Sequence, residues 1–202
     1  MNRRETLKMM AMAPLGAGLS WTKSDVEALR HKTDAARASG QAFEPAFFTP
    51  HEWQTLRVLV DYIIPADDRS GSATDAGVPE FIDFTMVDRP ALQTPMRGGL
   101  AWLDLECRDR FGEPFVTCRG AQQRAVLDDI AYPDDADPRF SHGVRFFTLL
   151  RDLTAGGFFS SKMGVEDLGY KGNTFVHEWT GAPPEVLQRL GVSYDDWIYR
   201  GA

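Results

Sequence analysis

PRFSHGVRFFTLLRDLT, residues 138–154, is the most apolar stretch with helical spacing in this 202-residue chain. Its apolar positions are Val144, Phe146-Phe147 and Leu149-Leu150, which recur at the steps of a helix surface. The stretch therefore predicts a helix. We expect that helix to end at Gly156-Gly157, because glycine disfavours a helix interior.

Several segments before and after this stretch share its helical spacing. The clearest start is Thr49-Pro50-His51-Glu52, where Thr49 can cap the helix, Pro50 suits its first position and Glu52 completes a capping box. The helices expected besides residues 138–154 cover about 50–64, 78–86, 92–111, 119–131 and 183–190. No stretch alternates polar and apolar residues as a strand would. The sequence predicts an all-α fold, a single domain of about five or six helices.

Three regions follow from composition. Residues 1–21 resemble an export signal, residues 22–46 are small and polar and predict a linker, and residues 47–202 form the helical domain. Within that domain, residues 158–181 are rich in glycine and aromatic residues and have no helical or strand period. We therefore expect a long irregular aromatic segment near the C-terminus.

The leader carries a twin-arginine motif. Arg3-Arg4 is followed by Leu7-Lys8 and by an uncharged stretch from Met9 to Trp21. The alternative is a chance pair of arginines, but this spacing favours export by the twin-arginine translocase to the periplasm. Because the apolar run of about 13 residues is shorter than the roughly 20 needed to span a bilayer, we expect only indirect membrane association.

Composition excludes several function classes. With 43% hydrophobic and 25% charged residues the chain is globular, and its net charge of −7 argues against a nucleic-acid partner. Dinucleotide, Walker A and Gly-x-Ser-x-Gly motifs are missing. The four histidines lack the helical spacing of metal ligands. We therefore predict no cofactor, no metal and no catalytic residue in this chain.

Two cysteines, Cys107 and Cys118, leave two interpretations open. In an oxidising compartment they could close a small loop that stabilises the fold by about 2–3 kcal/mol. Alternatively they are two buried thiols that behave as small apolar side chains. Gly112 and Pro114 lie between them and would let the chain turn back.

The aromatic segment is the strongest candidate for a binding site. Exposed aromatic side chains without regular structure favour a protein partner, because aromatics dominate interface anchors. The alternative is a segment folded over its own helices. The candidate interface residues are Phe158, Phe159, Tyr170, Asn173, Phe175, His177 and Trp179.

Three separated motifs, in this order, resemble the gluconate 2-dehydrogenase subunit 3 family. They are Trp53-Gln54-Thr55-Leu56-Arg57 running into 61–67, then Ala76-Gly77-Val78-Pro79-Glu80-Phe81-Ile82-Asp83, then 146–159 followed by Leu168-Gly169-Tyr170-Lys171-Gly172-Asn173. The likeness covers about residues 47–195, and the twin-arginine leader is also similar to the family's.

The resemblance implies a non-catalytic small subunit of a periplasmic sugar or polyol dehydrogenase. The large subunit would be a flavoprotein of the glucose–methanol–choline type that holds the FAD and the catalytic residues. The small subunit would supply the export signal and help its partner fold, and electrons would pass to a cytochrome c or another acceptor. Residues 179–184 are similar to the branch that oxidises sugars or glycosides, with the 3-hydroxyl as the suggested position.

Two other functions compete with this one. The chain could be an autonomous periplasmic sugar-active enzyme with His177 and Glu178 as an acid–base pair, although adjacent side chains point apart on regular structure. It could also be a free-standing sugar-binding protein. Activity of the isolated chain with an artificial electron acceptor, or sugar binding by a monomer, would distinguish them from a subunit.

Overall fold

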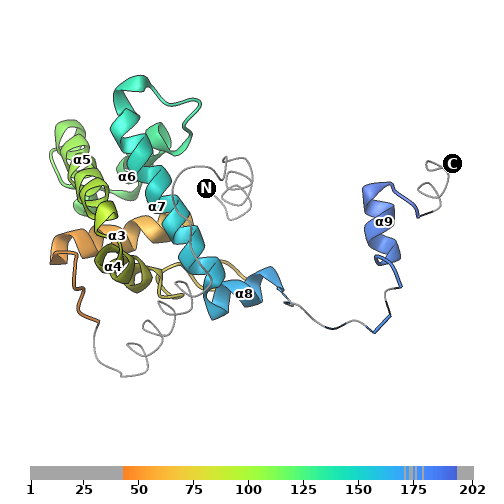
Figure 1. Cartoon of the computed structure of the whole chain (residues 1–202). Coiled ribbons are helices and arrows are strands. Elements are labelled where there is room, and N and C mark those ends of the chain that lie inside the picture. Colours follow the sequence, from red (N-terminus) through yellow and green to blue (C-terminus); the bar gives the residue numbers. More distant parts are fainter. Residues whose placement is uncertain (1–42, 171, 173–174, 176, 179, 195–202) are drawn as a thin grey trace. The chain divides into compact units, whose positions relative to one another are not determined.

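The computed structural model describes residues 43–170, 172, 175, 177–178 and 180–194. This part of the chain contains α-helices, short 3₁₀ turns and no strand, which confirms the all-α prediction (Figure 1). Its helices are α3 (Pro50–Ile63), α4 (Val78–Asp88), α5 (Gln93–Phe111), α6 (Gly120–Ala131), α7 (Ser141–Ser160), α8 (Lys162–Leu168) and α9 (Pro184–Leu190). Three 3₁₀ turns connect them: η1 (Pro90–Leu92), η2 (Phe115–Thr117) and η3 (Pro138–Phe140).

α3 starts as its sequence predicts. Thr49 accepts a hydrogen bond from the backbone N–H of Glu52, and the Glu52 carboxylate accepts one from the N–H of Thr49. The helix ends at Ile63, two residues before Pro65, because the residue preceding a proline is displaced from helical geometry. The capping box thus fixes the first turn of α3 and the position of His51 within it.

α7 is the central helix of the unit that ends at residue 170. It packs against α3, α4, α5, α6 and α8 (Figure 1), and its buried side chains include Phe146, Phe147, Leu150 and Phe158. The core around it also draws on Leu56 and Ile63 of α3, Ile82 and Met86 of α4, Leu103 of α5 and Ile130 of α6. The apolar stretch that predicts the helix is therefore also the one that organises the packing.

The fold departs from the sequence-based expectation at Gly156-Gly157. α7 continues through both glycines to Ser160, and the chain then enters α8, which the sequence analysis leaves as irregular structure. A Cβ added at Gly157 would lie 2.8 Å from Cδ1 of Phe81, so this glycine permits close packing of α7 on α4. The Ser161 hydroxyl accepts from the N–H of Gly164 and caps α8.

A buried carboxylate anchors the segment before α3. Asp83 of α4 is fully buried and accepts hydrogen bonds from the backbone N–H groups of Ala46, Phe47 and Phe48, at 2.9, 3.0 and 3.3 Å. Phe43 stacks on Trp53 with ring centroids 5.3 Å apart. These contacts hold residues 43–48 against α3 and α4.

A second unit begins at residue 171 and contains α9. Gly181 and Tyr194 meet within it, and the Tyr194 hydroxyl accepts from the N–H of Ala182 at 2.6 Å. No residue of α9 is buried, and Leu190 and Val192 are exposed. An isolated helix of seven residues is marginal in water, and burial of its own described residues adds little stability to α9.

Candidate functional site

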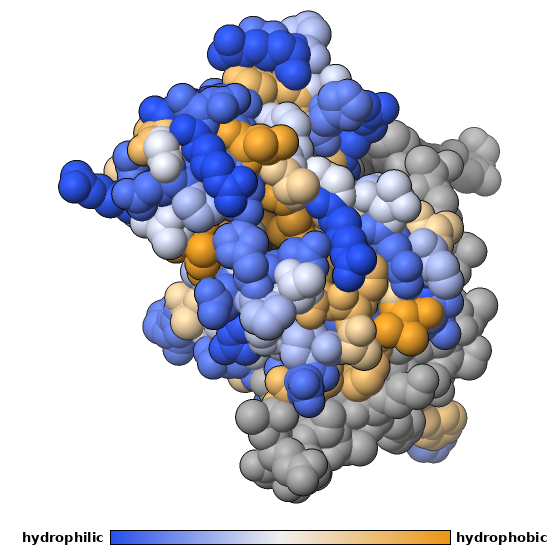
Figure 2. Space-filling model, turned by 90° about the vertical axis from the view of Figure 1, so that its left-hand side faces the viewer, coloured by the Kyte–Doolittle hydropathy of each residue, from blue (hydrophilic) through white to orange (hydrophobic). Residues whose placement is uncertain are grey.

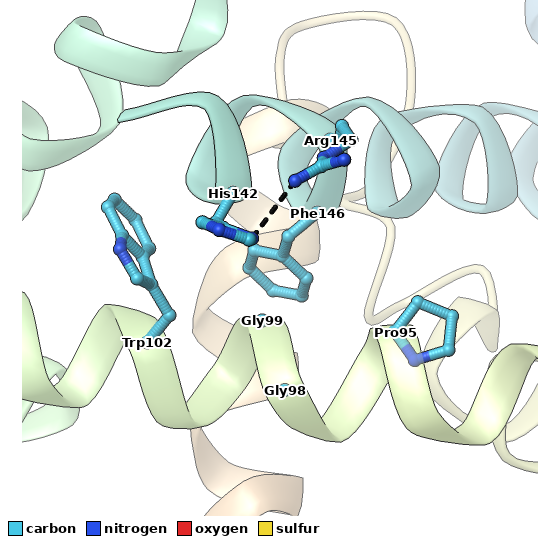
Figure 3. Close-up of a pocket in the computed structure, with 7 residues that line it drawn as sticks. All are labelled: Pro95, Gly98, Gly99, Trp102, His142, Arg145 and Phe146. Atoms are coloured by element: carbon cyan, nitrogen blue, oxygen red, sulfur yellow. Dashed lines mark hydrogen bonds between the residues drawn. The ribbon is translucent and has the colours of Figure 1, made fainter. Parts of the chain in front are cut away.

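An open groove of about 500 Å³ lies between α5 and the first turns of α7 (Figure 3). Its volume is within the range of ligand pockets, about 300–1,000 Å³. Its lining residues are Pro95, Gly98, Gly99, Trp102, His142, Arg145 and Phe146. Figure 2 shows one face of the molecule, on which apolar side chains are exposed between hydrophilic ones.

Two aromatic side chains form the walls, and each one rests on a glycine of the opposite helix. A Cβ added at Gly99 of α5 would lie 1.9 Å from Cδ2 of Phe146, and one added at Gly143 of α7 would lie 2.3 Å from Cη2 of Trp102. Trp102 also packs edge-on against Phe140, with ring centroids 6.3 Å apart. The walls are therefore fixed by packing between α5 and α7, and the groove is preformed.

The floor is open at Gly98. A Cβ added there would meet no atom within 4 Å, in contrast to the adjacent Gly99. Consecutive positions on a helix point about 100° apart, so one glycine faces the neighbouring helix and the other faces the groove. An incoming group can approach the backbone of α5 at this point.

The rim carries two nitrogen-bearing side chains from α7. Arg145 Nη2 donates a hydrogen bond to Nδ1 of His142 at 3.0 Å (Figure 3). Because a guanidinium cannot accept, Nδ1 is the acceptor and the imidazole proton is on Nε2. Both side chains are exposed, and their remaining polar atoms are hydrogen-bond donors. The lining contains no carboxylate.

A second, smaller pocket of about 220 Å³ contains a histidine–aspartate pair that the sequence analysis missed. His51 Nε2 lies 2.5 Å from Oδ2 of Asp104, and Oδ1 of the same carboxylate accepts from the N–H of Phe115 at 3.0 Å. Asp104 is buried and thus ties α3, α5 and η2 together. The partners are 53 positions apart, so no local spacing in the sequence could have indicated the pair.

The two cysteines are free and buried, one on α5 and one directly after η2. The Cys118 thiol donates a hydrogen bond to the backbone carbonyl of Glu113 at 3.5 Å. Burial, reinforced by the neighbouring Cys118, raises the pKa of the Cys107 thiol to about 12, and burial also raises the pKa of Cys118. A protonated thiol is a poor nucleophile, so neither group suits catalysis near neutral pH.

The predicted interface residues differ in their exposure. Phe158 is fully buried in the core beneath α7, and Phe159 packs partly buried against the same core, edge-on to Phe158. Phe158 therefore offers no surface to a partner in this structure, since α7 extends past Gly157 and turns this side chain inward. Tyr170, by contrast, is 67% exposed.

The remaining candidates lie after residue 170. Phe175 is 89% exposed, and its ring lies 6.2 Å from that of His177. His177 and Glu178 are both exposed. Asn173 and Trp179 lie outside the described residues, as do Arg3, Arg4, Leu7 and Lys8 of the export motif.

The described residues contain neither a cluster of metal ligands nor a helix suited to span a membrane. No three His, Cys, Asp or Glu side chains in that part of the chain gather in a way that could hold a metal ion. None of its helices combines the length and the apolar composition that crossing a bilayer requires.

The fold and the groove define the class of protein, a small all-α domain built around one central helix with a preformed groove on its surface. The chain belongs to the gluconate 2-dehydrogenase subunit 3 family, whose model matches residues 50–178. This finding confirms the resemblance carried by the sequence motifs. Proteins of this family are described as a subunit of a gluconate dehydrogenase complex, which implies a catalytic partner subunit. Comparison with curated proteins and with solved structures gives no match.

Proposed function

We propose that this chain is the non-catalytic small subunit of a periplasmic, FAD-dependent dehydrogenase of sugars or glycosides. The partner is a flavoprotein of the glucose–methanol–choline type, which holds the FAD and the catalytic residues and passes electrons to a cytochrome c or another acceptor. The observation that carries the proposal is membership of a family of dehydrogenase subunits.

The small subunit has two tasks in this proposal. Arg3-Arg4 with Leu7-Lys8 directs the folded pair to the twin-arginine translocase, and the helical domain stabilises the flavoprotein during maturation. Exposed aromatic side chains support a role in protein binding, because such side chains are frequent interface anchors. Tyr170 and Phe175 are the exposed members of the predicted interface set that the structure describes, together with His177.

Affinity capture of the full chain from its native periplasm tests the subunit assignment. We expect a yellow eluate with flavin absorption and one large flavoprotein at equal stoichiometry, identified by mass spectrometry. A colourless eluate that contains this chain alone would overturn the assignment. It would favour an autonomous enzyme, to be tested on sugars with an artificial electron acceptor, with His177 and Glu178 as first targets.

Replacement of Arg3-Arg4 by Lys-Lys tests the export task. We expect both the variant and the flavoprotein to remain in the cytoplasm, measured by immunoblot of cell fractions. Export of the flavoprotein at its normal level alongside the variant would refute the escort role and leave the subunit assignment intact.

A further inference from the structure

We propose that the groove between α5 and α7 is a docking site for the catalytic flavoprotein, and that it receives a segment in which an acidic side chain lies next to an aromatic or aliphatic one. The inference rests on the proposed function and adds the surface and the chemistry of the contact. Three properties of the groove support the inference: its charge, its apolar lining and its rigidity.

The charge of the groove selects an acidic group. Arg145 and His142 hydrogen-bond to each other and offer only donors to a ligand, and Arg145 has no carboxylate partner among the described residues. A donor-only rim is satisfied by an acceptor, and a carboxylate binds a guanidinium through two parallel hydrogen bonds. The groove is thus cationic on a chain whose net charge is −7.

The apolar lining of the groove selects an apolar group beside that carboxylate. Pro95, Gly98, Trp102 and Phe146 offer no side-chain acceptor, and only the indole N–H is a donor. A sugar or glycoside would leave most of its hydroxyl groups without partners there, which is costly on burial. An aromatic or aliphatic side chain has no such requirement, and an open backbone at Gly98 lets it approach closely. A protein segment meets both requirements better than the dehydrogenase substrate does.

The rigidity of the walls favours a stable interface. Phe146 and Trp102 are each fixed against a glycine of the opposite helix, so little side-chain freedom is lost when the groove is occupied. Hot spots in interfaces are typically such preformed pockets that receive an anchor side chain. The same partner would also contact the exposed aromatic residues Tyr170 and Phe175.

Two helical glycines give a matched pair of variants. Gly98 and Gly156 are both exposed, both lie within α-helices, and an added Cβ at either meets nothing within 4 Å. Gly98 lines the groove and Gly156 does not. Gly98→Trp fills the floor, and Gly156→Trp places the same side chain elsewhere on the surface. Each variant is made in the full chain and co-expressed with the flavoprotein identified by affinity capture.

We expect Gly98→Trp to weaken the complex at least tenfold by titration, with Gly156→Trp and Gly98→Ala within twofold of the wild type. Arg145→Ala should also weaken it, and Arg145→Lys should restore part of the affinity. Far-UV circular dichroism and thermal melting of each free variant verify folding. If Gly98→Trp is folded and binds the flavoprotein as tightly as the wild type, the docking inference is wrong and the subunit assignment stands. If the wild type itself holds no flavoprotein, both are wrong.

Photo-cross-linking identifies the occupant. A benzophenone amino acid at position 98 of the full chain should cross-link to a flavoprotein peptide that contains Asp or Glu beside an apolar residue, whereas position 156 should not. Cross-linking from position 98 only to a second copy of this chain, or to no protein in the intact complex, would overturn the inference.

Discussion

The adjacent glycines of α5 should respond to alanine in opposite directions. At Gly99 the new Cβ would lie 1.9 Å from Phe146 Cδ2 and 2.5 Å from its Cβ. Carbon atoms at van der Waals contact are about 3.5–4.0 Å apart, so Phe146 or α7 must move by about 1.5–2 Å. At Gly98 nothing lies within 4 Å, and the methyl group enters solvent.

The magnitudes follow from these contacts. Overpacking of a buried site costs about 1–3 kcal/mol and occasionally more, and expulsion of a buried Phe costs about 1.5–3 kcal/mol. Because Phe146 is 2% exposed, we take about 3 kcal/mol for the clash at Gly99, offset by about 1 kcal/mol of helix propensity. Gly99→Ala should therefore destabilise by about 2 kcal/mol. Gly98→Ala should stabilise by about 0.5–1 kcal/mol.

Urea unfolding followed by circular dichroism measures both variants. The difference between them, about 3 kcal/mol, corresponds to a separation of about 6–12 °C in Tm for a chain of this size. A third variant, Gly157→Ala, should resemble Gly99→Ala because of its contact with Phe81, and Gly156→Ala should resemble Gly98→Ala. Equal stabilities for Gly98→Ala and Gly99→Ala would show that α5 and α7 are not in close contact at Gly99 and that Phe146 is not a fixed wall of the groove.

Two further predictions concern buried polar groups. Asp83→Ala should lower the free energy of unfolding, measured by urea unfolding, by about 3 kcal/mol or more. Hydrogen bonds to a charged group contribute about 1.5–3 kcal/mol, and three N–H groups lose theirs in this variant. Asp83→Asn should recover part of the loss. Folding favours the protonated form of the Cys107 thiol, whose pKa is raised from 9 to about 12. Its contribution to the free energy of unfolding is therefore complete below pH 9 and falls by about 1.4 kcal/mol per pH unit from pH 9 towards pH 12. Stability curves of the wild type and Cys107→Ala should converge over that range, and parallel curves would contradict the raised pKa.

Local patterns in the sequence predict the fold well where the physical cause is local. The capping box at Thr49 and Glu52 forms as predicted, because all of its hydrogen bonds lie within four residues. The end of α7 is mispredicted because Gly157 makes room for Phe81, a residue on another helix. The burial of Phe158 could not be predicted for the same reason, since a helix that continues past Gly157 turns this side chain into the core.

The groove could not be predicted for a related reason. Its walls depend on Gly99 meeting Phe146 and Gly143 meeting Trp102, contacts between positions 47 and 41 residues apart on two helices. In the sequence, Gly98-Gly99 indicates only that the helix predicted over residues 92–111 is weakened near its start. The missing information is which glycine of the pair faces the other helix, and that depends on the rotation of α5 about its own axis.

Gly98 and Gly156 also allow the stability of the helices to be tested separately from the function of the groove. Each costs its helix about 1 kcal/mol relative to alanine, and a Cβ added at either position would meet no atom within 4 Å. If alanine at both positions raises stability equally while tryptophan at position 98 alone disrupts the complex, then helix propensity and docking are independent at Gly98. The free space above this residue then matters for what enters the groove from the partner, and the packing of α5 on α7 depends on its neighbour Gly99.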